Sequence, residues 1–134
     1  MIIDTSAVIA ILRAERDGPV YAQAIERSPR RSMSAANYLE TAIVIDASRD
    51  PIASRRFDDF LSAAAINIEP VTERQAQLAR EAYRDFGKGR RHSASLNFGD
   101  CFAYALARDT GEPLLFKGSD FARTDIRPAL TQQV

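Results

Sequence analysis

Residues 1–12 read MIIDTSAVIAIL, and they place one carboxylate, Asp4, between two apolar runs. The Ile-rich start is typical of a short buried strand, and residues 5–15 have the pattern of a helix that Thr5 or Ser6 could cap. Asp4 therefore stands at the edge of the predicted core. Because a charge in that position is costly unless a partner compensates for it, another part of the chain is expected to supply that partner.

The rest of the chain alternates between short apolar runs and helical patterns. Further strands are predicted at residues 30–35, 66–71 and 112–116, with a short edge strand at 126–130. Helices are predicted at residues 20–28, 35–48, 52–65, 72–87 and 98–111, and the last two end on glycines that suit helix C-termini. Strands that alternate with helices predict a parallel sheet covered by helices on both faces.

The apolar stripe of the helix predicted at residues 35–48 allows two interpretations. Leu39, Ala42 and Ile43 fall on one face by the i, i+3, i+4 rule, which first indicates a core face. The same stripe, together with residues 57–65, could equally form an apolar groove for the helix of a partner. The sequence leaves both open.

Composition limits the class of protein. The chain has 134 residues, of which 46% are hydrophobic, and this predicts a single domain spanning residues 1–134. Its 18 basic and 18 acidic residues balance, which argues against binding to nucleic acid or membrane through bulk charge. One cysteine excludes an internal disulfide, and we find neither a signal peptide nor an apolar run of membrane-spanning length. These features predict a cytoplasmic protein.

Four carboxylates lie beside apolar segments, each near the end of a predicted element: Asp4, Glu40, Asp100 and Asp120. Asp4 and Asp120 follow predicted parallel strands, so they should open on the same edge of the sheet. Clustered carboxylates repel one another and need protons or cations to hold them together. Hard cations such as Mg²⁺ or Mn²⁺ prefer such oxygen ligands. The bland alternative is that each acid caps a helix or pairs with an arginine.

Four stretches carry a family resemblance: residues 1–12, SAANYLETAIVI at 34–45, LNFGDCFAYALA at 96–107 and PLLFKGSDFARTDI at 113–126. They resemble the successive motifs of PIN-domain ribonucleases, and most closely those of VapC toxins from bacterial toxin–antitoxin pairs. The resemblance implies an α/β fold, a three-layer sandwich with a short, mainly parallel sheet of four to five strands flanked by helices. It also implies a Mg²⁺- or Mn²⁺-dependent endoribonuclease that a cognate VapB-type antitoxin silences.

Carried over by motif, the resemblance assigns catalytic roles to Asp4, Glu40, Asp100 and Asp120, with Asp4 and Asp100 as metal ligands. The resemblance also implies that Ser6 could donate a hydrogen bond to a ligand or a phosphate. One departure concerns the last motif, because many relatives have GDDF where this chain has Gly118-Ser119-Asp120-Phe121. Asp125 is a possible substitute for the missing acid, although a turn residue is the simpler interpretation.

Basic residues near these motifs are candidates for contacts with RNA phosphates: Lys88, Arg90, Arg91 and Lys117. A thiol mechanism with Cys101 as nucleophile and His92 as base is conceivable, but no third group that would orient the base is visible. A small buried apolar role for Cys101 is the simpler expectation. Tyr104 is expected in the core or in a pocket wall.

Rival functions are weaker. A haloacid-dehalogenase-type phosphatase needs a second Asp two residues after the first, and here that position is Ser6. A receiver-type phosphoacceptor would carry its acceptor Asp later in the chain. A catalytically weakened PIN-like module that only binds RNA or protein remains the alternative, and Ser119 gives it weight. If the chain is such a ribonuclease, the resemblance implies an RNA substrate and a separate antitoxin. We expect the antitoxin to cover residues 40–47 and 57–65 and to insert a basic side chain among the acids. We also expect a homodimer through apolar helix faces.

Overall fold

The structure is a computed structural model that describes residues 1–89 and 94–131. Its sheet has four parallel strands in the order β3-β2-β1-β4. The strands are β1 (Ile2–Ile3), β2 (Ser32–Ser34), β3 (Asn67–Glu69) and β4 (Leu114–Leu115). The helices are α1 (Thr5–Leu12), α2 (Gly18–Arg27), α3 (Ala35–Asp46), α4 (Pro51–Ala63), α5 (Glu73–Phe86) and α6 (Phe98–Thr110).

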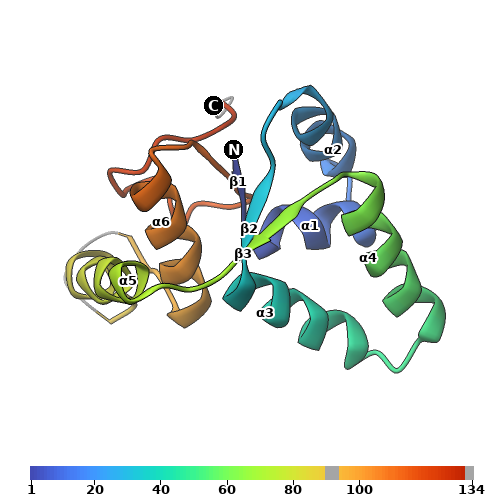
Figure 1. The fold of residues 1–134 in the computed structure, drawn as a ribbon, viewed down its shortest axis with the longest axis horizontal. Coiled ribbons are helices and arrows are strands. Elements are labelled where there is room, and N and C mark those ends of the chain that lie inside the picture. The colour runs from blue at the N-terminus through green and yellow to red at the C-terminus, as the bar shows by residue number, and fades with distance from the viewer. Residues whose placement is uncertain (90–93, 132–134) are drawn as a thin grey trace.

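Helices cover both faces of this sheet. Figure 1 shows α5 and α6 on one side of the strands and α1, α2 and α4 on the other, with α3 at the end where the strands point. Successive residues of β1 face opposite layers, as a strand requires. Ile2 belongs to the apolar cluster around α5 and α6, whereas Ile3 belongs to the cluster around α1 to α4. The predicted three-layer architecture is confirmed.

Local signals explain most helix ends. Gly111 ends α6 with φ 72°, a left-handed conformation that glycine adopts without strain. Pro51 occupies the first turn of α4, where its missing N–H costs nothing. The prediction that Thr5 or Ser6 caps α1 is wrong, because the cap is Asp4, whose side chain accepts the backbone N–H of Ser6. An Asp side chain caps a helix as well as Ser or Thr does, and the backbone of Asp4 is still extended, as a cap position requires.

The structure excludes the core interpretation of Leu39 and Ile43, leaves the partner groove as a prediction, and corrects the expected edge strand. The face of α3 that carries Leu39 and Ile43 is exposed, by 57% and 60%, and the buried face carries Asn37, Thr41 and Ile45 instead. The helix is turned this way because its polar side chains bind partners from α1 and α6. The predicted edge strand at residues 126–130 contributes, within the described residues, one bridge between Leu114 and Pro128.

Within the same described residues, no helix is both long and apolar enough to cross a lipid bilayer.

Candidate active site

Asp4 directly follows β1 and is the N-cap of α1. Its backbone N–H donates to the carbonyl of Leu115 at 2.9 Å, so it lies at the carboxyl end of the sheet. Its side chain is only 3% exposed, and one oxygen, Oδ2, accepts both the N–H and the hydroxyl of Ser6, at 3.0 and 2.6 Å. The other oxygen, Oδ1, is buried without a hydrogen-bond partner. A buried, unpaired carboxylate oxygen is costly, so this atom is suited to a ligand.

Ser6 fixes the direction of that carboxylate. Its hydroxyl donates to Asp4 and accepts the backbone N–H of Lys117 at 2.9 Å, which ties α1 to the segment after β4. The hydroxyl is thus occupied on both sides. Its observed contacts orient Asp4, while the predicted contact with a substrate stays a prediction.

Asp100 lies in the first turn of α6, where it forms a capping box with Asn97. The Asn97 side chain accepts the N–H of Asp100 at 2.9 Å, and the Asp100 carboxylate accepts the N–H of Asn97 at 3.0 Å. This reciprocal pair holds the carboxylate in one orientation. The sequence prediction did not include Asn97, although Asn three residues before Asp is a recognisable capping pattern.

The pKa values show that the acids act on one another. The pKa of Asp100 is raised to about 7, chiefly by burial and additionally by the charges of Asp4, Asp120 and Glu40, while the hydrogen bond from Asn97 opposes the shift. The pKa of Asp4 is raised to about 6, chiefly by burial and additionally by the charge of Glu40, while the hydrogen bonds from Ser6 oppose the shift. The four predicted acids are therefore close enough to interact electrostatically, which separate helix caps would not be.

Glu40 reaches this group from α3. Its Oε1 accepts the hydroxyl of Thr5 at 2.6 Å and the amide of Asn37 at 3.3 Å. Its other oxygen lies against Gly99, where an added Cβ would stand 1.9 Å from Oε2. A glycine at that position of α6 is therefore what leaves space for the Glu40 carboxylate.

Asn37 is a functional candidate that the sequence reasoning missed. It is fully buried, and its amide donates to the carbonyl of Gly99 at 2.9 Å as well as to Glu40, so it links α3 to α6. Its Oδ1 has no hydrogen-bond partner. Thr41, one turn further, donates to the carbonyl of Asn37 at 2.8 Å. Two polar residues four apart on the helix of Glu40 were the available signal for a buried polar face.

Asp120 completes the group from an exposed loop after β4. Its charge contributes to the raised pKa of Asp100. Ser119, which stands where many relatives have a second acid, is exposed on the same loop. Asp125 is engaged elsewhere, because it accepts the hydroxyl of Tyr104 and pairs with Arg108 at 3.7 Å. A turn position is thus the better description of Asp125.

The donor set is made of oxygens, as Mg²⁺ and Mn²⁺ require. Across residues 1–89 and 94–131, however, no three His, Cys, Asp or Glu side chains form a group that could hold a metal ion by themselves. Mg²⁺ commonly binds through one or two carboxylates and keeps several waters. Asp4, with its unpaired Oδ1, and Asp100, with its raised pKa, fit that mode of binding.

Of the basic residues predicted to contact RNA phosphates, Lys117 is described by the structure and Arg90 and Arg91 are not. Lys117 directs its ammonium to Glu15 and Asp17, at 2.7 and 2.9 Å, and these hydrogen bonds raise its pKa, so the charge is already compensated. Its contact with a phosphate remains a prediction. Arg90, Arg91 and His92 lie outside the described residues.

Cys101 is buried below this site. Its thiol donates to the carbonyl of Asn97 at 3.2 Å, and burial, followed by the charge of Asp100, raises its pKa to about 11. The thiol therefore stays protonated at neutral pH, whereas a nucleophilic cysteine needs a lowered pKa. Tyr104 is buried, as expected.

Comparison with known proteins identifies the family. The family model described as PIN domain matches residues 1–127. The chain belongs to the PIN-domain family. Ribonuclease VapC28 of Mycobacterium tuberculosis is 56% identical over 133 residues, which cover 99% of this chain and all of that protein. Ribonuclease VapC42 of the same organism is 50% identical over 131 residues, which cover 98% of this chain and all of that one. This confirms the resemblance to VapC ribonucleases.

Solved structures agree on the PIN fold. VapC20 of Mycobacterium tuberculosis, described as a Sarcin-Ricin loop cleaving toxin, superposes with a TM-score of 0.74 at 19% identity, over 95% of this chain and 98% of that one. A toxin–antitoxin complex from Klebsiella pneumoniae gives 0.70 at 19% identity, over 92% of each chain. At this identity the likeness concerns the fold.

Proposed function

We propose that the chain is a cytoplasmic, Mg²⁺- or Mn²⁺-dependent endoribonuclease, the toxin of a type II toxin–antitoxin pair. The observation that carries the proposal is that four acids lie close enough for the charges of Asp4, Glu40 and Asp120 to add to the effect of burial on the pKa of Asp100, while Oδ1 of Asp4 is buried without a hydrogen-bond partner. Membership among the VapC ribonucleases supports RNA as the substrate. The alternative, a module that only binds RNA or protein, would have no need to hold these carboxylates together.

Each residue has a defined task in this proposal. Asp4 and Asp100 would hold the cation, and Ser6 and Asn97 orient their carboxylates. When bound, the cation supplies a water of lowered pKa and stabilises the charge that develops on the attacked phosphate. Glu40 stays beside that position through Thr5 and Asn37. Asp120, on its exposed loop, would complete the pocket either directly or through water.

The metal requirement gives the first test. Cleavage of RNA is expected to require Mg²⁺ or Mn²⁺, to stop in EDTA and to return when the cation is added back. The products should carry a 5′-phosphate and a 3′-hydroxyl, because a water attacks the phosphorus. End-group analysis of the fragments checks this. Full activity in EDTA, or a 2′,3′-cyclic phosphate, contradicts the mechanism, and a chain without any carboxylate-dependent Mn²⁺ binding is a binding module.

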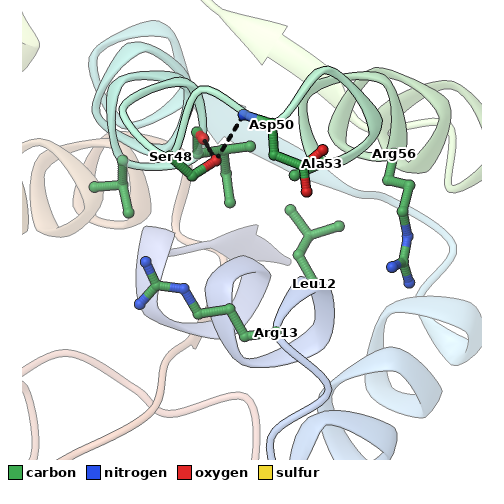
Figure 2. A pocket seen from close by; sticks show the side chains of 8 residues that line it. Leu12, Arg13, Ser48, Asp50, Ala53 and Arg56 are labelled. Carbon is green, nitrogen blue, oxygen red and sulfur yellow. Dashed lines mark hydrogen bonds between the residues drawn. The ribbon is translucent and has the colours of Figure 1, made fainter.

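The proposed antitoxin has an apolar surface to occupy. Leu39 and Ile43 on α3 and Ile52 on α4 are all more than half exposed. Beside them lies a cavity of about 210 Å³ between α1, α3 and α4. Figure 2 shows Leu12 and Arg13 of α1 on one side of this cavity and Ala53 and Arg56 of α4 on the other. An amphipathic helix fits such a surface, and a basic side chain beyond its end would pair with the acidic group.

Charge placed on that surface tests the partner. Ile43→Glu should weaken binding of the co-expressed antitoxin, because it buries an unpaired carboxylate, and should leave metal-dependent cleavage intact. Val20→Glu on α2, which replaces another exposed apolar residue, is the matched control. Equal antitoxin affinity of the two variants, measured by calorimetry, would show that the interface lies elsewhere.

The chain is also expected to form a homodimer, so light scattering should give twice the mass of one chain. A monomer at micromolar concentration would contradict this prediction.

A further inference from the structure

A second hollow lies behind the acidic group, between α5 and α6. Figure 1 shows these two helices side by side, on the face of the sheet opposite α1, α2 and α4. The cavity measures about 580 Å³, within the roughly 300–1,000 Å³ of small-molecule sites. Its lining is mainly apolar and includes Ala79 from α5 and Phe98 and Phe102 from α6, while Arg80 and Lys88 add two cationic side chains. None of the four acids belongs to it.

Phe98 is the exposed aromatic wall of this cavity. Its side chain is 79% exposed, the largest value among the exposed large apolar residues of the described chain. The ring is nearly perpendicular to that of Phe102, with centroids 4.9 Å apart and an interplanar angle of 81°. Phe102 therefore contacts one side of the Phe98 ring, and most of the Phe98 side chain remains exposed to a flat partner.

Asn97 is a direct structural link between this cavity and the acidic group. Asn97 lines the cavity, and the same residue forms the capping box with Asp100. Phe98 and Asp100 both lie in the first turn of α6, but two positions on a helix put their side chains on opposite sides. A nucleotide chain that passes over the N-terminal end of α6 would therefore have a phosphate at the acids and an adjoining base in the cavity.

We propose that the cavity binds a nucleobase of single-stranded RNA next to the cleaved phosphate, with the base stacked on Phe98 and the neighbouring phosphates near Arg80 and Lys88. This inference rests on the proposed ribonuclease function. An aromatic face with adjacent cations is how proteins hold unpaired bases, because every base offers a flat face and every linkage a negative charge.

Binding of RNA in EDTA tests this separately from catalysis. The probe is a fluorescein-labelled single-stranded RNA of mixed sequence, followed by anisotropy with the full chain. Phe98→Ala should bind about tenfold more weakly, the loss of one base–aromatic stack, whereas Phe98→Trp should keep the affinity. Val20→Ala, which removes a side chain that is 53% exposed on α2, is the matched control and should bind like the wild type. Because Phe98 is largely exposed, its variants should keep the melting temperature.

Abasic sites introduced one at a time into the probe locate the contact. Wild-type affinity should fall at one position beside the cleavage site, and that dependence should vanish in Phe98→Ala. Arg80→Gln and Lys88→Gln should each lower the salt dependence of binding by about 0.7 in log–log slope. Equal affinity of Phe98→Ala and wild type, or no RNA binding by the wild type, overturns the inference. So does a halved mass of Phe98→Ala in light scattering with unchanged RNA affinity, which would make the cavity a contact between copies.

The two proposals fail differently. Wild-type protein that leaves RNA uncut in Mg²⁺ and Mn²⁺ contradicts the ribonuclease function, whatever the binding experiment gives. Wild-type protein that cuts RNA while Phe98→Ala binds it normally contradicts only the base-binding cavity.

Discussion

Asp4→Asn and Asp100→Asn are each expected to lower RNA cleavage by roughly a hundredfold or more. Loss of one electrostatic stabiliser of a transition state typically costs about 3 kcal/mol, and each of these acids is a proposed ligand of the cation. Single-turnover cleavage at saturating Mn²⁺ measures the effect. Asp58→Asn, the same change at an exposed position of α4, is the control and should retain wild-type turnover. Wild-type turnover by Asp100→Asn would show that the site is wrongly assigned.

The same two variants should gain stability when no metal is present. The pKa of Asp100 rises from 3.8 in the unfolded chain to about 7 in the folded one, so the folded state binds more protons between these values. Stability of the metal-free wild type should therefore fall as pH rises from about 4 to about 7. Asp100→Asn removes this contribution, and thermal melts across that pH range in EDTA should show a smaller fall in its melting temperature.

Cys101→Ser should remain active, because a thiol that stays protonated takes no part in the proposed mechanism. A folded but inactive Cys101→Ser protein would support a thiol mechanism instead.

Gly99→Ala is expected to reduce activity strongly while the protein remains folded. The added methyl group would stand 1.9 Å from Oε2 of Glu40, so the carboxylate must leave and lose its hydrogen bonds to Thr5 and Asn37. The displaced atom is the end of a flexible side chain, which makes the move cheap for the fold, and Ala suits a helix better than Gly. Cleavage should fall about as far as in Glu40→Ala.

A double-mutant cycle separates this steric mechanism from others. In the Glu40→Ala background the conflict is gone, so Gly99→Ala should cause little further loss, and the two effects should not add. Gly87→Ala gives a useful contrast, since its methyl group would meet the backbone carbonyl of Tyr83 at 2.2 Å. That conflict cannot be relieved by a side-chain rotation, so this variant should lose melting temperature. Additive losses at positions 40 and 99 would contradict the proposed steric origin.

Local patterns were sufficient for the parallel architecture, whereas the roles of the four acids came from the family resemblance and stay predictions. The positions of Gly111 at a helix end and of Asp4 at the end of a strand follow from their neighbours in the sequence, so a window of a few residues predicts them. The contacts around Glu40 are different, because Asn37 and Gly99 meet across 62 positions of chain. Nothing in the periodicity of either helix encodes that meeting.

The face of α3 illustrates the same limit. Hydrophobic periodicity allowed burial of Leu39 and Ile43, yet the helix buries Asn37 and Thr41. Hydrogen bonds to α6 and α1 satisfy the Asn37 amide and the Thr41 hydroxyl, although Oδ1 of Asn37 has no partner. A periodicity argument ranks side chains by apolarity and cannot know which polar groups will find partners.

The two layers divide the chain by order of synthesis. The apolar cluster around α1 to α4 is built mostly from residues 1–66, and the cluster around α5 and α6 mostly from residues 75–126. Asp4 and Glu40 belong to the early part, and Asp100 and Asp120 to the late part. Because a chain emerges from the ribosome with its N-terminal part first, the acidic group cannot assemble until Asp100 and Asp120 have been synthesised. A chain released before α6 would carry only Asp4 and Glu40, and it would lack one of the two proposed metal ligands.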